Sequence, residues 1–269
     1  MTELTLDRAW PCIFTPCDAQ KVASIQLAPE TWAARQPLVH ASVPLSSSLY
    51  LEHGLLGRYR TDRLGRRQFL SLQIPGDYVD LPAYMLGHLD HNLEAISEAV
   101  VRRTPHDAVH MLRQQEPDLF QKLWKISLID ASIDRYWTFR VGRLVGRARV
   151  ANFFCEMLLR FYARGLCDFD GFRLQVTQVD LAEICGMTPV HVNRLMAELR
   201  DEGICTFSQG HLRITNLPDL FQTGQYSWDY LYLDPETDRE IRKRVTATRR
   251  GPLHNGPSLL SATKGAGPI

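Results

Sequence analysis

The chain has 269 residues, 45% hydrophobic and 23% charged, which is typical of a folded globular protein with one large or two ordinary domains. Its net charge of +1 excludes any argument for nucleic-acid binding from overall charge, so such a role must rest on a local motif. No apolar run approaches the ~20 residues of a membrane span, and the start of the chain carries Glu3 and Asp7, so we expect a cytoplasmic protein with no membrane partner.

The cysteines are scattered and include no C-x-x-C pair, which indicates neither a zinc site nor a disulfide framework. We expect reduced thiols and no metal. The six positions are Cys12, Cys17, Cys155, Cys167, Cys185 and Cys205.

The first half of the chain predicts an antiparallel β unit. Prolines interrupt residues 1–47, which we interpret as an irregular arm or short strands that begin this unit. Residues 48–74 read as two strands joined by a turn at 62–65, and a second turn signal follows at 75–77. A short helix over 81–86, strands near 92–103 and a helix from Pro105 to about 115 complete a sensory domain over 48–116.

A long helix is predicted over about 117–141, because apolar residues recur at intervals of three and four. A helix of about 39 Å needs a partner along its length, so we expect the stripe to pair in a parallel two-fold dimer. Gly142 and Gly146 mark a hinge, which closes a segment of 117–146. The predicted interface residues are Leu119, Leu123, Ile126, Ile129, Ile133, Trp137, Val141 and Leu144.

Two short helices with clear start signals follow the next helical segment, 147–164. Thr177 is a good N-cap with Asp180 three residues later, and Gly186 supplies a left-handed residue that ends this helix. Thr188 caps the next helix, and Pro189 stands at its first position. The spacing predicts a helix-turn-helix over 177–201.

A hairpin after these helices predicts a wing, with strands at 203–207 and 212–215 joined by a turn at 208–211. Residues 147–222 therefore predict a winged helix that binds double-stranded DNA, with the start of its second helix in the major groove. The candidate DNA-binding residues are Thr177, Thr188, Pro189, Val190, His191, Asn193, Arg194 and Arg200.

The sequence resembles the Crp/Fnr family of transcription regulators. The motifs that carry the resemblance are Leu181 to Ile184, Gly186-Met187-Thr188, Val192-Asn193-Arg194, Leu199-Arg200 and Glu202-Gly203-Ile204, together with Leu51-Glu52-His53-Gly54, Gly65-Arg66-Arg67-Gln68 and Leu72-Gln73-Ile74-Pro75-Gly76-Asp77. The likeness covers about residues 48–220. It implies an α+β fold with a cyclic-nucleotide-binding-type β-roll, a long dimerisation helix and a C-terminal winged helix, with no enzymatic activity. It also implies a palindromic operator and RNA polymerase as a partner.

Three departures from the family pattern shape the expected ligands and DNA site. Members that bind cyclic AMP place an arginine after the Pro-Gly-Asp turn, but residues 81–88 contain none. Oxygen-sensing members use an N-terminal cysteine cluster, whereas here Cys12 and Cys17 alone precede the β-roll. We therefore expect no cofactor and no dependence on cyclic AMP. Val190 replaces a glutamate that many relatives carry, and the string from Val190 to Arg194 resembles the FixK-like branch.

Two alternatives stay open at this point. His88 and His91, with Glu94 nearby, could serve a cupin-like β-barrel metalloenzyme or a haem or redox sensor, although histidines three apart on a strand face opposite sides. Cys185 lies just before the turn glycine, so it is either a buried structural thiol or a redox-sensitive residue close to the DNA face.

The C-terminal extension, 223–269, is not assigned to the winged helix. After Tyr232 it becomes polar, basic and rich in glycine and proline. This composition predicts a disordered, mobile tail.

Overall fold

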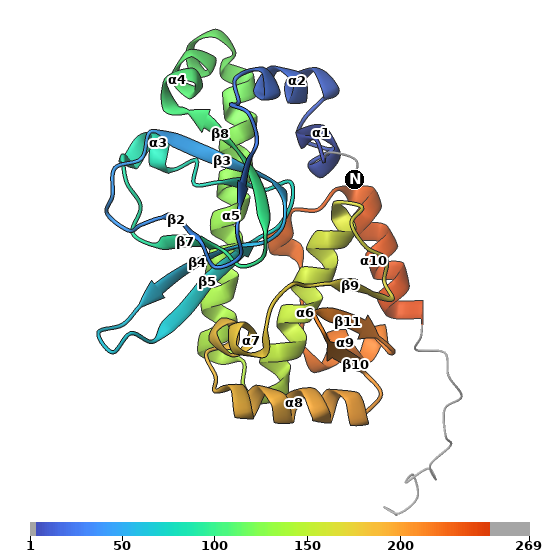
Figure 1. The fold of residues 1–269 in the computed structure, drawn as a ribbon. Coiled ribbons are helices and arrows are strands. Elements are labelled where there is room, and N and C mark those ends of the chain that lie inside the picture. Colours follow the sequence, from blue (N-terminus) through green and yellow to red (C-terminus); the bar gives the residue numbers. More distant parts are fainter. Residues whose placement is uncertain (1–3, 248–269) are drawn as a thin grey trace, which may run out of the picture.

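The computed structural model describes residues 4–247, which form a β-roll, a long helix and a winged helix in that order (Figure 1). The predicted α+β architecture is confirmed. Among the described residues, no helix combines the length and the hydropathy that a membrane crossing requires.

The β-roll consists of two antiparallel four-stranded sheets with the strand orders β1-β8-β3-β6 and β2-β7-β4-β5. Residues 48–61, predicted as a single strand, form two strands in different sheets, because Gly54 adopts a left-handed φ of 86°. A Cβ at Gly54 would lie 2.2 Å from the Glu98 carbonyl oxygen, so the close turn requires glycine. The strands are β1 (Glu30–Trp32), β2 (Pro37–Val39), β3 (Ser47–His53), β4 (Leu56–Thr61), β5 (Arg67–Gln73), β6 (Tyr78–Val79), β7 (Asn92–Ala95) and β8 (Ala99–Pro105), and the short helix α3 is Ala83–Leu86.

The N-terminal arm is more regular than predicted. It contains the helices α1 (Leu6–Ala9) and α2 (Pro16–Ser24) before its two strands. Thr15 and Asp18 form a complete capping box at the start of α2, and Pro16 occupies its first turn. The interpretation of this segment as irregular is wrong for 16–24, because these prolines begin a helix instead of breaking one.

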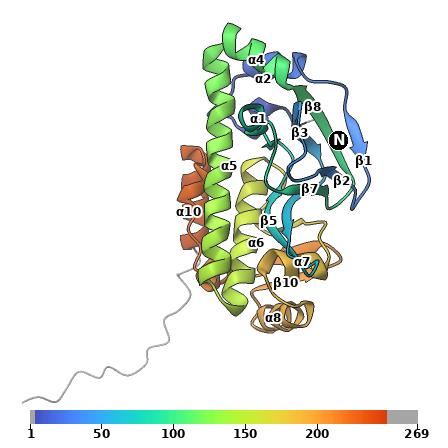
Figure 2. The ribbon, with the colours of Figure 1, turned by 90° about the vertical axis from the view of Figure 1, so that its left-hand side faces the viewer.

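Helix α4 (His106–Gln115) leads into α5 (Pro117–Arg143), which runs from one end of the molecule to the other (Figure 2). The apolar stripe of α5 faces inward: seven of its eight predicted interface residues are at most 5% exposed and Val141 is half-buried. The assignment of Leu119, Leu123, Ile126, Ile129, Ile133, Trp137, Val141 and Leu144 to a dimer interface is therefore wrong. The physical reason is that the cores of the β-roll and of the winged helix already cover this stripe within one chain.

The winged helix has the predicted order of elements. Helix α6 (Gly146–Ala163) follows the break after α5, and Gly146 takes a left-handed φ of 52° at that break. The two helices α7 (Gln178–Cys185) and α8 (Pro189–Asp201) lead into the hairpin of β10 (Cys205–Ser208) and β11 (His211–Ile214). A third strand, β9 (Gly171–Arg173), pairs with β11, and α9 (Leu217–Thr223) follows the hairpin.

The C-terminal extension is folded as far as the structure describes it. It forms a 3-10 turn, η1 (Asp229–Leu231), and helix α10 (Pro235–Ala247). The predicted mobile tail is thus wrong for 235–247, where aromatic side chains that precede α10 pack on the core and hold the segment. The rest of the predicted tail, 248–269, lies outside the described residues.

Candidate nucleic-acid interface

The start of α7 is fixed by its own side chains. The Thr177 hydroxyl accepts a hydrogen bond from the Asp180 backbone N–H at 3.1 Å, and the Asp180 carboxylate accepts one from the Thr177 N–H at 2.7 Å. Gly186 ends the helix with a φ of 60°. Because both ends are defined locally, the turn into α8 has a fixed geometry.

Helix α8 buries one face and exposes the other. Thr188 caps it by accepting a 3.3 Å hydrogen bond from the His191 backbone N–H, and Pro189 occupies its first turn. Val192, Leu195 and Leu199 pack into the core of the winged helix. The first two turns therefore present the remaining side chains to solvent.

The exposed side chains of α8 include four of the predicted DNA-binding residues, which stand together at its first turns. Val190 is 81% exposed, and Asn193 and Arg194 are exposed beside it. The Arg194 guanidinium donates to the His191 imidazole at 3.1 Å. Arg200 is also exposed but lies about 10 Å further along the helix than Asn193, and it pairs with Asp201.

Thr177 lies apart from this group, at the exposed start of α7, and its hydroxyl is engaged by Asp180. Asp180 itself turns toward the β-roll, where Arg35 binds it. Sequence reasoning missed Arg35 because the two residues are 145 positions apart and no local pattern links them.

The predicted wing is an antiparallel pair of β10 and β11 in register from Cys205 with Ile214 to Ser208 with His211. Gln209 and Gly210 form its turn with left-handed φ values of 50° and 74°. The hairpin begins after the C-terminal end of α8, as a winged helix requires.

The interior of the β-roll contains its own ion pairs. Arg58 on β4 is 4% exposed and lies 3.2 Å from Asp80 and 2.6 Å from Asp130 of α5. Burial raises the pKa of Asp130 to about 6, against the opposing effect of Arg58. These residues tie the β-roll to the long helix.

His88 and His91 are not brought together as a site. His88 is exposed, whereas His91 is buried, with one ring nitrogen 3.3 Å from Asp80 and the other 3.1 Å from Asp90. Within residues 4–247, no three histidine, cysteine or acidic side chains are grouped so that they could hold a metal ion. The alternative based on these histidines has no support.

Cys185 is fully buried at the end of α7. Burial raises the pKa of its thiol to about 12. Since the thiolate is the species that reacts with oxidants, this environment favours the structural role of Cys185 over the redox role.

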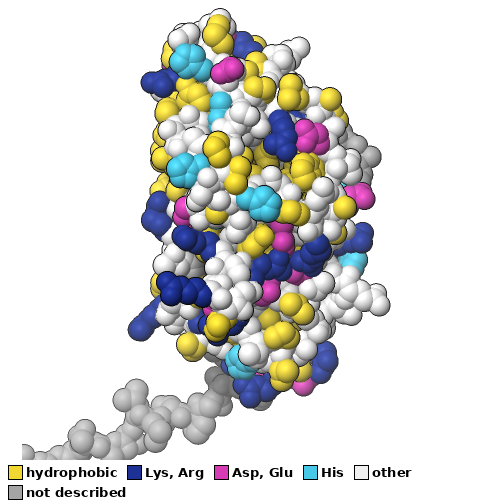
Figure 3. Space-filling view, turned by 60° about the vertical axis from the view of Figure 1, so that its left-hand side comes forward, with side chains coloured by type: hydrophobic (Ala, Val, Ile, Leu, Met, Phe, Trp, Pro, Cys, Tyr) yellow, Lys and Arg dark blue, Asp and Glu magenta, His cyan; other side chains and the backbone are white. Residues whose placement is uncertain are grey.

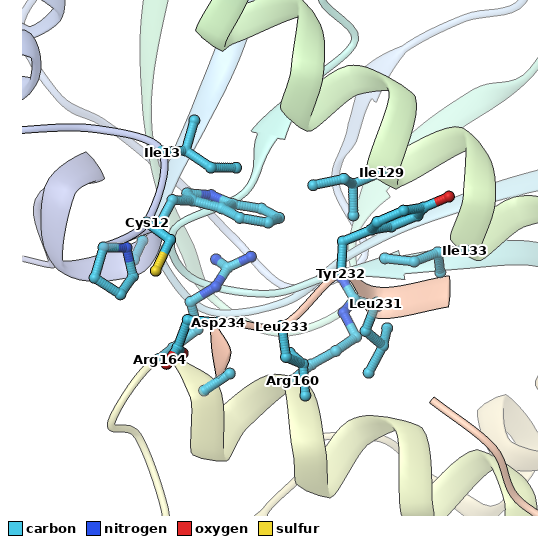
Figure 4. Close-up of a pocket in the computed structure, with 14 residues that line it drawn as sticks. Cys12, Ile13, Ile129, Ile133, Arg160, Arg164, Leu231, Tyr232, Leu233 and Asp234 are labelled. Atoms are coloured by element: carbon cyan, nitrogen blue, oxygen red, sulfur yellow. The ribbon is translucent and has the colours of Figure 1, made fainter. Parts of the chain in front are cut away.

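A cavity of about 50 Å³ lies where the N-terminal arm, α5, α6 and the C-terminal extension meet (Figure 4). Ile129 and Ile133 line it from α5, Leu231 from the extension and Arg164 from the end of α6. The terminal nitrogens of Arg164 donate to the Pro75 carbonyl oxygen and to Asp77. The volume suits roughly three or four water molecules, which is far too small for a nucleotide.

Comparison with known proteins agrees with this geometry. A family model described as a Crp-like helix-turn-helix domain matches residues 148–222. The chain is 26% identical over 187 residues to the anaerobic regulatory protein of Pasteurella multocida, covering 70% of this chain and 68% of that one. It is 22% identical over 215 residues to the transcriptional activator protein FnrL of Cereibacter sphaeroides, covering 77% and 85%.

A solved structure, FixK2 from Bradyrhizobium japonicum, shares the fold with a TM-score of 0.66 and 20% identity. The similarity covers 75% of this chain and 98% of that chain. The similar region thus contains the β-roll, the long helix and the winged helix together.

Proposed function

Because the chain belongs to the Crp/Fnr family of transcription regulators, we propose that it binds a palindromic operator as a homodimer, through the start of α8. The chain is a DNA-binding regulator and not an enzyme. The observation that carries the proposal is the solvent-facing first turns of α8, whose helix is capped and whose opposite face is buried. This is the arrangement that places a recognition helix in the major groove.

The proposed dimer uses the outward face of α5, opposite the buried stripe. The residues of this face recur at alternating steps of four and three, which is the period of a two-stranded coiled coil. Leu128, at the centre of this face, is 58% exposed. The face consists of Gln121, Trp124, Leu128, Ala131, Arg135, Thr138 and Gly142.

Pairing through this face would relate two copies of α8 by a two-fold axis. Recognition helices in such dimers stand about 34 Å apart, one turn of DNA, and the operator is then a palindrome. A Leu128→Glu substitution is expected to shift the protein from dimer to monomer, because it would place two carboxylates face to face in the seam. Analytical ultracentrifugation measures the change, and Leu64→Glu, at a hairpin tip that is 77% exposed, is the matched control.

We assign base contacts to the exposed start of α8. Arg194 has the fork that pairs with guanine and Asn193 the amide that pairs with adenine, whereas Val190 can contact a thymine methyl group. Thr188, Pro189 and His191 border the same surface, and we assign phosphate contacts to Thr177 and Arg200. Val190 in place of the glutamate of many relatives implies a different base preference at that position.

Arg194→Ala is expected to cost about 1–3 kcal/mol of binding to the operator and to relax specificity at one position. Fluorescence anisotropy with the operator and with random DNA measures both affinities. Arg239→Ala, which removes an exposed arginine of α10, controls for the loss of charge. An unchanged ratio between operator and random DNA in Arg194→Ala would refute the assignment.

We further propose that DNA binding does not depend on cyclic AMP. Residues 81–88 contain no arginine for a cyclic phosphate, and the arginine inside the β-roll, Arg58, is already paired with Asp80 and Asp130. Addition of cyclic AMP is therefore expected to leave operator affinity unchanged. Since its DNA partner and RNA polymerase occur in the bacterial cytoplasm, we place the regulator there, with RNA polymerase as its second partner.

A further inference from the structure

We propose that Arg35 and Arg67 are positioning residues for DNA binding, because they fasten the β-roll to the first helix of the helix-turn-helix. They belong to a cluster of five charged side chains that we call the latch. Three members come from the β-roll and two from α7: Arg35, Arg67, Glu94, Asp180 and Glu183. Figure 3 shows acidic and basic side chains side by side across the middle of one face of the molecule.

Arg35 and Asp180 form the central pair of the latch. The two terminal nitrogens of Arg35 donate to the two oxygens of Asp180, each at 2.5 Å. This is the planar two-point geometry in which an arginine fixes direction as well as distance. Asp180 is 1% exposed, and the same carboxylate caps α7 through Thr177. A shift of the helix start would therefore break the cap contacts and the arginine pair together.

Arg67 provides the second connection. Its Nε and one terminal nitrogen lie 2.7 Å from Glu183 on α7, while the other terminal nitrogen lies 2.5 Å from Glu94 on β7. The guanidinium is 4.7 Å from the centroid of Phe69 and 5.2 Å from that of Tyr59. Arg67 is thus held by its own sheet while it contacts the DNA-binding domain.

The backbone of Arg35 points to a role for its side chain. Arg35 adopts a φ of 70°, in the left-handed region that residues other than glycine rarely occupy. Its amide donates to the Ala95 carbonyl oxygen at 2.6 Å, so the turn is anchored to β7. Strained positions of this kind persist where a side chain is needed in a particular place, and here that place is Asp180.

The latch determines how α8 stands relative to α5. The covalent link between α5 and α6 passes through a break in the helix at 144–145 and the left-handed Gly146, which is a natural hinge. Helix α7 packs on β5 on one side and on α8 on the other, so a fixed α7 also fixes α8. Because the start of α8 stays uncovered, the latched arrangement is one that can meet DNA and not one that masks it.

This inference rests on the proposed palindromic dimer, since the latch would then set the distance between two recognition helices. A dimer with intact latches should prefer one spacing between half-sites. Without Arg35 the start of α7 loses its central anchor on the β-roll, so the helix-turn-helix must be ordered when DNA binds. We expect Arg35→Ala to lower affinity for the preferred spacing about tenfold and to bring the affinities for altered spacings close to it.

The experiment compares three variants with the wild type on the selected operator and on the same half-sites moved apart by one and two base pairs. Arg35→Ala breaks the central pair, and Arg66→Ala, which removes an arginine that pairs locally with Asp62, is the matched control. The third variant, Arg60→Ala, breaks an exposed ion pair with Asp90 within the β-roll and should also keep the wild-type spacing preference. Hydrogen exchange at residues 143–147 and at the start of α7 is recorded without DNA, and faster exchange is expected in Arg35→Ala alone.

The spacing preference on DNA and the hydrogen exchange without DNA distinguish a failure of the latch from a failure of the proposed dimer. A wild type with no spacing preference would contradict the palindromic dimer, while faster exchange in Arg35→Ala would still support the latch in the free protein. Wild-type exchange in Arg35→Ala would overturn the latch. Faster exchange with a wild-type spacing ratio would overturn its role in positioning the recognition helices. Thermal melting of each variant establishes that it is folded.

Discussion

Several contacts join the winged helix to the rest of the chain, and two of them are built from different chemistry. The first, which we call the inner junction, joins α5, α6 and the C-terminal extension around Glu156, which is 0% exposed. Glu156 accepts hydrogen bonds from Arg140, Trp137 and Tyr230. The second contact is the latch, whose Arg35 side chain is 41% exposed. The comparison indicates that the inner junction supplies stability and the latch supplies orientation.

The two contacts differ because their charged groups differ in access to water. A buried charge has lost its hydration and depends fully on its protein partners, so removing one partner is costly. In the latch, Arg35 is half-exposed and can exchange its partner for water, while the buried Asp180 keeps its hydrogen bonds from Thr177. The same number of hydrogen bonds can therefore contribute very different amounts to the free energy of unfolding.

The largest expected effect comes from Glu156→Gln, which would leave the buried guanidinium group of Arg140 without its charged partner. We expect a loss of about 3–5 kcal/mol in the free energy of unfolding, measured by urea denaturation. The control is Glu202→Gln, in an exposed ion pair with Arg147, for which we expect a change of about 1 kcal/mol or less. Equal losses of unfolding free energy in Glu156→Gln and Glu202→Gln would contradict the stabilising role of the buried inner junction.

The difference in unfolding free energy between wild type and Glu156→Gln should also depend on pH. Burial alone would raise the pKa of Glu156, but Arg140 and Arg160 hold it below its usual value of 4.5. A depressed pKa in the folded state means that the carboxylate contributes stability above pH 4.5 and loses that contribution as the pH falls further. The gap between wild type and Glu156→Gln should narrow below this pH, and a gap that widened would contradict the buried ion pair.

A smaller loss is expected from Tyr230→Phe in the C-terminal extension. The substitution removes the hydroxyl that donates to Glu156 at 2.9 Å but keeps the ring, which stacks 3.8 Å from that of Tyr136. We expect a loss of about 1 kcal/mol in the free energy of unfolding. Tyr232→Phe, at a position that is 64% exposed, should have no measurable effect. A Tyr230→Phe protein as stable as the wild type would exclude the extension from the inner junction.

The sequence-based predictions that the structure confirms rest on interactions between residues close together in the sequence. The helix-turn-helix is predictable because Thr177, Asp180 and Thr188 satisfy backbone groups within three residues of themselves, and Pro189 suits a first helical turn, so no distant partner matters. The same signal occurs at Thr15, where the surrounding prolines conceal it if they are taken only as helix breakers. Reading Pro16 as a first-turn residue would have identified α2.

Predictions that needed a distant partner failed. The stripe of α5 correctly indicated an amphipathic helix, but periodicity gives the direction of a buried face and not what covers it. The polar composition after Tyr232 concealed α10, since the aromatic residues that anchor it, such as Trp228 and Tyr230, come before the polar segment. The latch joins residues up to 145 positions apart, which no single-sequence pattern encodes.

The smallest effect on stability is expected from the pair of Arg67 and Glu183, on the latch side of the comparison. Arg67 is 22% exposed and Glu183 24%, so water replaces much of what the pair loses, and we expect this pair to contribute about 1 kcal/mol or less. A double-mutant cycle of Arg67→Ala with Glu183→Ala, followed by urea denaturation, isolates the coupling between the two side chains. A coupling as large as the loss in Glu156→Gln would make the latch a stability element. A small coupling, together with a changed spacing preference in Arg35→Ala, would show that the latch orients the recognition helix without contributing much to the free energy of unfolding.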